Sequence, residues 1–111
     1  MGKDARADYD AVVSEIVSSS GATTGAMFGM PCLKHGGKAF AGFYEGAMVF
    51  KLGGEAHAEA LALAGAHLFD PSGRGRPMKE WVVVPHEYVE RWGELAGEAL
   101  EYCVVTNRGV R

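Results

Sequence analysis

The stretch of the chain that decides the fold is AMFGMPCLKHGGKAFAGFYEGAMVFKL, residues 26–52. It predicts three β-strands joined by two tight turns, because runs of strong β-formers are separated by Gly36-Gly37 and by Glu45-Gly46. The rest of the chain reads as helices that pack on this sheet and as strands that extend it. The stretch therefore indicates a sheet built from neighbouring antiparallel strands.

Two-residue loops at both turns set the register of the predicted strands. One face is then almost wholly apolar and is the expected core side; it carries Met30, Cys32, Ala41, Phe43, Met48, Phe50 and Leu52. The opposite face is mixed, as is typical of partial exposure; it carries Gly29, Leu33, Phe40, Tyr44, Val49 and Lys51. A three-residue loop at Glu45 would exchange the faces of the third strand, and this alternative stays open. Pro31 cannot donate to a strand ladder, so we expect its strand to lie at the sheet edge or to be bulged.

Hydrophobic periodicity and glycine positions predict the flanking elements. They are a helix over 4–20, a loop over 21–26, a helix over 55–64, strands over 66–70 and 78–84, and a helix over 86–105. Asp4 or Asp8 is the expected N-cap of the first helix. Trp81 and Trp92 are expected in the core.

The predicted order is α-β-β-β-α-β-β-α. Strands that are adjacent in sequence favour antiparallel pairing, so we expect an α+β two-layer sandwich with a five-stranded antiparallel sheet and helices. The 111 residues fit a single domain, 1–111, with its core over about 5–105.

Composition restricts the classes of function. The formal net charge of −3 argues against attraction of nucleic acid or acidic lipid over the whole surface. Cys32 and Cys103 are far apart and in no metal or redox spacing, so we expect buried thiols in a reducing compartment. No apolar run reaches the roughly 18 residues of a membrane span, and the N-terminal residues lack the apolar core of a secretory signal. These features together predict a cytoplasmic protein without a membrane partner.

Five short motifs follow one another in the order of the predicted elements: Met27-Phe28-Gly29, GKAFA over 37–41, FKL over 50–52, the segment from Gly65 to Phe69, and RPMKEWV over 76–82. With them the chain resembles the TfoX N-terminal domain-like family, named for the TfoX/Sxy regulators of bacterial natural competence. The resemblance runs over about 26–102 and implies an α/β sandwich with an antiparallel sheet.

The named competence regulators carry a further C-terminal helical domain, whereas this chain stops at Arg111. A role in competence is therefore not carried over. The resemblance implies a stand-alone bacterial member of the family, of unknown activity, and it brings no catalytic residues.

The loop PSGRGRPMK, residues 71–79, is a candidate anion-binding loop. Arg74, Arg76 and Lys79 alternate with glycines, which let a backbone approach a ligand, and Arg offers a planar fork to phosphate or carboxylate. The alternative is a solvated loop whose cations pair with nearby acids. The Walker spacing is absent.

A candidate interaction face is formed by Leu33, Phe40, Tyr44 and Lys51. If these residues share the less buried face of the sheet, they make an apolar surface with one cation that suits a protein partner. The alternative is that helices cover both faces.

No catalytic constellation stands out. The histidines are His35, His57, His67 and His86, and none pairs at helical spacing with another metal ligand. Cys32 is expected in the core, where a thiol is not activated. Asp70, Glu80 and Glu87 are separate carboxylates. We therefore expect no enzymatic activity, no metal and no cofactor.

The leading hypothesis is a small non-enzymatic regulatory or protein-interaction domain that binds a protein partner or itself as a homodimer. One alternative is a nucleic-acid-associated transcription or competence regulator that uses the basic loop. Another is a small-molecule-binding domain with a closed apolar pocket.

Overall fold

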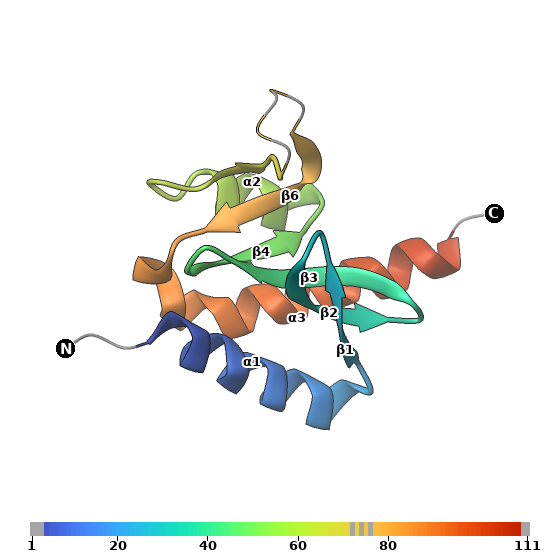
Figure 1. Cartoon of the computed structure of the whole chain (residues 1–111). Coiled ribbons are helices and arrows are strands. Elements are labelled where there is room, and N and C mark those ends of the chain that lie inside the picture. The colour runs from blue at the N-terminus through green and yellow to red at the C-terminus, as the bar shows by residue number, and fades with distance from the viewer. Residues whose placement is uncertain (1–3, 72, 74, 76, 110–111) are drawn as a thin grey trace.

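The computed structural model of the chain describes residues 4–71, 73, 75 and 77–109 (Figure 1). Its elements are α1 (Ala5–Ser20), β1 (Thr23–Met27), β2 (Met30–His35), β3 (Lys38–Tyr44), β4 (Ala47–Lys51), α2 (Gly54–Leu61), β5 (His67–Phe69), β6 (Met78–Val84), a 3-10 turn (His86–Tyr88) and α3 (Val89–Gly109). The α+β class with an antiparallel sheet is confirmed. The sheet has six strands in the order β1-β2-β3-β4-β6-β5, one more than predicted. Within the described residues, no helix is both long and apolar enough to cross a membrane.

The helices cover one face of the sheet. Figure 1 shows α3 passing behind β3, with α1 below the sheet and leading directly into β1, and α3 packs on both β3 and β4. The larger core lies in this layer, where Trp92 of α3 and Phe50 of β4 are fully buried together with Tyr9 of α1. Burying such large side chains supplies most of the folding free energy of a small domain.

A smaller core lies on the other face. Met30, Val49, Phe69, Trp81 and Val83 form it, and the side chains packed around it also come from strands. Phe28, at the tip of the β1–β2 hairpin, and Tyr44, at the end of β3, both pack edge-on against Phe69 of β5, with ring centroids 6.3 and 5.0 Å away. Since β1 and β5 are the two ends of the strand order, the sheet is strongly curled.

Local chemistry explains the bounds of α1. The Asp4 carboxylate accepts a hydrogen bond from the Arg6 N–H at 3.1 Å, so one of the two expected caps is confirmed. Gly21, at φ 80°, ends the helix in the left-handed conformation. The Asp8 carboxylate lies 2.7 Å from His86 Nε2, and this pair holds α1 against the segment that opens α3.

The turn at Glu45-Gly46 has two residues. Both have positive φ, 51° and 83°, and the flanking pairs are Tyr44↔Ala47 and Phe43↔Met48. The two-residue alternative is therefore the correct one, and β4 shows its faces as expected. Glu45 therefore adopts the left-handed backbone conformation, which residues other than glycine disfavour because of their Cβ atom.

The predicted register of the first hairpin is correct next to its turn, where Lys34 pairs with Ala39, and is wrong by one residue beyond that pair. Leu33 pairs with Ala41 but Lys34 pairs with Ala39, so Phe40 is an extra residue in β3. Phe40 therefore joins Ala41 on the helix side, and so does Leu33, whereas Met30 belongs to the smaller core. The predicted division of these residues between the two faces is corrected accordingly.

The predicted loop over 21–26 is also wrong, because β1 occupies most of it. β1 makes β2 an internal strand, so Pro31 is not on an edge strand. Pro31 pairs with Ala26 of β1, while the ladder with β3 begins only at Cys32↔Gly42. Pro31 thus lies just beyond the end of the β2–β3 ladder, where its missing N–H interrupts no pair of that ladder.

The strain at Glu45 leads to a stability prediction. We expect Glu45→Asn to raise the free energy of unfolding by about 0.5–1 kcal/mol, because Asn enters the left-handed region more readily than Glu. Urea unfolding followed by circular dichroism measures the change. Glu45→Gln removes the same charge without the conformational preference and should leave stability nearly unaltered. An Asn variant no more stable than the Gln variant would contradict the turn described above.

Candidate interaction surface

The outer side of β1 presents unpaired backbone groups. The two-residue turn Phe28-Gly29, with φ of 50° and 75°, follows the closing pair Met27↔Met30. The closing pair of such a hairpin is hydrogen-bonded, and hydrogen-bonded pairs then alternate along the ladder. Thr24 and Ala26 therefore direct their N–H and C=O groups away from β2, and the described residues place no strand beside them.

No residue of β1 itself is of the kind that normally protects a sheet edge, and the charge that lies over β1 comes from Lys34 of β2. The sequence of β1, TTGAM, contains neither a charge nor a proline, and its register with β2 is regular over all five pairs. The opposite edge strand, β5, has only three residues and an irregularity between Leu68 and Phe69. Short and bulged edges resist strand addition, whereas a regular uncharged edge accepts it. β1 is therefore the edge at which another chain can pair.

A groove of about 290 Å³ runs between α1 and the β1–β2 hairpin. It is lined by Arg6, Tyr9, Asp10, Val13, Thr24, Gly25, Pro31 and Cys32. Thr24 pairs with Leu33 of the helix-side core, so the Thr24 and Ala26 side chains lie on the side of the sheet that faces α1. Val17, one turn beyond Val13 on α1, is 36% exposed. The groove thus adds a partly apolar floor beside the open backbone.

The other face of β1 carries a lysine. A Cβ built at Gly25 would lie 3.0 Å from Lys34 Cε and 3.5 Å from Lys34 Nζ. The Lys34 side chain therefore extends from β2 across the edge strand, over the place where Gly25 has no side chain. The lysine is half-buried.

The polar groups of the groove neutralise one another or are held in their uncharged forms. Arg6 Nε lies 3.0 Å from the Asp10 carboxylate, and the Arg6 guanidinium lies over the Tyr9 ring at 5.7 Å. Burial, reinforced by the nearby Cys32 thiol, raises the pKa of Tyr9 to about 12. Burial also raises the pKa of the Cys32 thiol. Neither group is activated as a nucleophile or base near neutral pH.

The predicted interaction face does not exist as a surface. Leu33 and Phe40 are 0% exposed in the helix-side core, because the bulge turns Phe40 inward and the pairing Leu33↔Ala41 keeps Leu33 beside it. Tyr44 packs on Phe69. Lys51 is half-buried, with Nζ 3.8 Å from the Glu80 carboxylate. Two of the four predicted residues are therefore unavailable to a partner.

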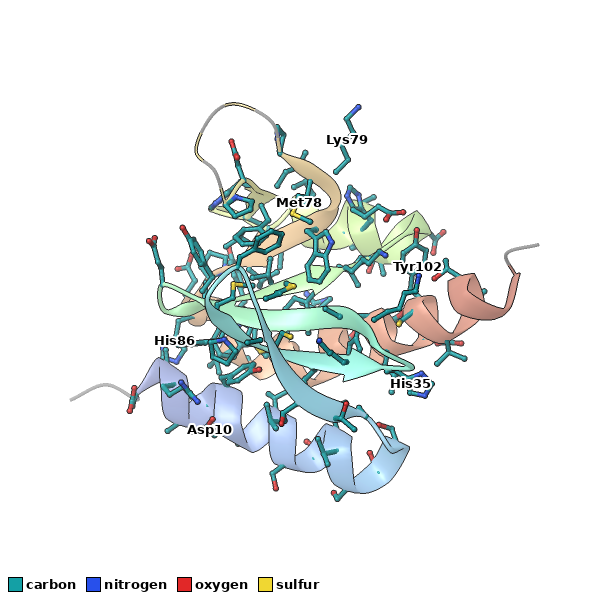
Figure 2. The ribbon with its side chains drawn as sticks, turned by 45° about the vertical axis from the view of Figure 1, so that its right-hand side comes forward. Asp10, His35, Met78, Lys79, His86 and Tyr102 are labelled. Atoms are coloured by element: carbon teal, nitrogen blue, oxygen red, sulfur yellow. The ribbon has the colours of Figure 1, made fainter. Side chains whose placement is uncertain are left out.

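A carboxylate from the residue that precedes the predicted anion-binding loop already occupies backbone donors of the loop. The N–H groups of Gly73 and Gly75 donate to the two oxygens of Asp70, at 3.0 and 2.9 Å. An anion that approached these backbone donors would have to displace Asp70. Of the three cations proposed there, Arg74 and Arg76 lie outside the described residues, and the exposed Lys79 side chain projects from the start of β6 (Figure 2).

The histidines occupy separate places, as Figure 2 shows for His35 and His86. His57 Nε2 lies 2.8 Å from the Lys79 carbonyl, and His67 Nδ1 lies 3.2 Å from the Gly65 carbonyl. Within the described part of the chain, no group of three or more His, Cys, Asp or Glu side chains is arranged to hold a metal ion.

A second groove, of about 190 Å³, separates α2 from α3 and is acidic. Glu55 and Glu59 line it from α2, and Glu94 and Glu98 line it from α3. Only Arg91 opposes them within the lining, with Nε 3.5 Å from the Glu94 carboxylate. This side of the molecule therefore repels phosphate groups.

β1 is the element of this candidate surface that the sequence analysis did not predict as a strand. Two signals for it were present. The β-branched pair Thr23-Thr24 favours a strand, and Phe28-Gly29 has the form of a two-residue hairpin turn with glycine at its second position. The Lys34 side chain over Gly25 has no comparable signal, because the two residues meet only through the register of the hairpin.

Comparisons of the chain with protein-family models, with curated proteins and with solved structures find no match. The resemblance to the TfoX N-terminal domain-like family therefore stays a prediction.

The buried phenol of Tyr9 gives a pH prediction. An unfolded tyrosine loses its proton near pH 10, whereas Tyr9 in the folded protein retains it up to about pH 12. Between these values unfolding releases a proton, so the contribution of Tyr9 to stability is complete below pH 10 and is lost as the pH rises to 12.

Tyr9→Phe keeps the ring and removes this titration. We expect its free energy of unfolding, measured in urea, to fall less steeply than that of the wild type above pH 10. A difference absorbance titration at 295 nm between the two proteins should locate the Tyr9 transition. Parallel loss of stability in both proteins would show that the phenol is not buried as described.

Proposed function

We propose that this chain is a non-enzymatic interaction module that binds an extended segment of a partner protein by adding it to β1 as a further strand. The observation that carries the proposal is the open edge at Thr24 and Ala26, where backbone donors and acceptors point outward from a regular, uncharged strand. Strand addition is a recurrent mode of peptide recognition, in which main-chain hydrogen bonds give affinity and alternate side chains give specificity.

The surroundings of β1 support a binding role. The groove beside α1 offers a place for the side chains of an added strand that point to the helix layer. Five regular pairs with β2 hold β1 in the sheet, so the open edge belongs to an ordered strand. A preformed edge lowers the entropic cost of ordering on binding.

The state of the thiols and carboxylates supports binding over catalysis. The Cys32 and Cys103 thiols are buried, and burial raises the pKa of each. A thiol with a raised pKa is a poor nucleophile at neutral pH. The Asp70 carboxylate beside the basic loop and the acidic groove between α2 and α3 favour a protein partner over a nucleic acid.

The family resemblance supports the biological setting of the proposal. A bacterial member of the TfoX N-terminal domain-like family would act as a cytoplasmic regulatory domain. Strand addition to β1 is the physical means that we propose for such regulation.

The proposal is tested with a peptide library and an edge-blocking variant. Peptides selected from a random 12-residue display library on the wild-type protein should bind in an extended conformation at β1. Ala26→Pro removes an outward N–H and places the proline ring at the edge, so these peptides should bind it at least about tenfold more weakly. Ala26→Val keeps the N–H and should retain binding.

Hydrogen exchange provides a second readout that does not depend on the variant. Bound peptide should slow exchange of the Thr24 and Ala26 amides. Circular dichroism and urea unfolding establish that Ala26→Pro is folded; if it is not, Thr24→Pro takes its place at the other outward position. The proposal fails if no peptide is selected, or if the selected peptides neither protect these amides nor respond to an edge proline.

A further inference from the structure

The Lys34 side chain places a single positive charge over the edge strand β1. Its Cε and Nζ lie over Gly25, the central residue of β1. Among the described residues, no carboxylate lies within ion-pair distance of Lys34, whereas Lys51 and Arg6 each have one. The ammonium group of a half-buried lysine that has no carboxylate within ion-pair distance is a favourable site for an incoming carboxylate.

The geometry of a sheet determines which residue of an added strand meets this lysine. A side chain directly opposite Gly25 lies on the same face of the sheet as Gly25, and therefore beside Lys34 Nζ. The residues before and after it, opposite Thr24 and Ala26, point to the other face. There they meet the groove beside α1.

The groove favours apolar side chains at those two positions. Val13 and the Tyr9 ring contribute to its wall, and the charges of Arg6 and Asp10 are already paired with each other. A charged residue of the partner would gain no free counter-ion there and would lose its hydration. The two faces of the edge thus favour different side chains of an added strand: an acidic one beside Lys34 and apolar ones in the groove beside α1.

From this arrangement we infer that the segment bound at β1 belongs to a different protein and carries an acidic residue flanked on both sides by apolar residues. The inference rests on the proposed strand addition and specifies its ligand. The Asp or Glu carboxylate pairs with Lys34 on one face of the sheet, and the flanking side chains enter the groove beside α1 on the other.

The same charge disfavours a second copy of this chain. In the two-fold pairing that uses both outward residues, Thr24 of one copy faces Ala26 of the other and the two Gly25 residues face each other across the axis. Because the two-fold axis is perpendicular to the sheet, both Lys34 ammonium groups then lie near it on one face. Like charges in such a position repel each other.

A charge-reversal selection tests the inference. The same 12-residue display library is selected in parallel on the wild type, on Lys34→Glu and on Lys34→Gln. We expect Asp or Glu to be enriched at one position between apolar residues on the wild type, and Lys or Arg at that position on Lys34→Glu. Lys34→Gln, the uncharged control, should show no charge preference. Replacing the acid by its amide in a selected peptide should weaken binding to the wild type by about fivefold and leave binding to Lys34→Gln unchanged.

The outcomes separate this inference from the proposed function. Peptides that lose binding to Ala26→Pro but show no acidic preference would overturn the inference and leave strand addition standing. Absence of any peptide at the edge would overturn both. Sedimentation velocity of the wild-type chain should show a monomer; a dimer that Ala26→Pro abolishes would establish a second copy as the occupant and overturn the choice of a different protein. Urea unfolding of both Lys34 variants, expected to resemble that of the wild type, confirms that they are folded.

Discussion

The extra residue at Phe40 is the constraint on which the rest of the structure depends. The β2–β3 ladder passes from Leu33↔Ala41 to Lys34↔Ala39, and the residue left over turns its ring into the helix layer. A fully buried Phe40 contributes a large apolar surface to the core beneath α1 and α3. A bulge of this kind also increases the local twist of the strands that it joins.

The twist explains how a single sheet makes two cores. Beyond the bulge, the β1–β2 hairpin crosses over one face of the sheet. Phe28 at its tip therefore contacts Phe69 of β5, the strand at the other edge. Met30 and Trp81 are buried in the smaller core that this curled sheet encloses. The curl covers one face of the sheet with its own hairpin, while the helices cover the other. What it leaves open is the outer backbone of β1.

The recognition that we propose for this molecule depends on main-chain groups and one lysine. Asp70 and His86 are already engaged, Asp70 as acceptor of the Gly73 and Gly75 N–H groups and His86 beside the Asp8 carboxylate. Burial also keeps the pKa of the Cys32 thiol high. Backbone donors at Thr24 and Ala26 need no particular side chain, which is why a motif search along the chain does not detect them. Their direction follows from the closing pair of one hairpin turn.

The sequence by itself determined the fold class, the positions of the helices and the burial of Trp92, because these depend on periodicity and capping within short segments. It limited the turn at Glu45-Gly46 to two alternatives, and the backbone of the folded chain shows that the two-residue one is adopted. Only the tertiary structure decided the burial of Leu33 and Phe40, the pairing of β1 and the position of Lys34 over Gly25. These features depend on strand register, and a shift of one residue moves every following side chain to the other face. Local pattern does not contain that information, because the register is selected by the packing of the whole sheet against its helices.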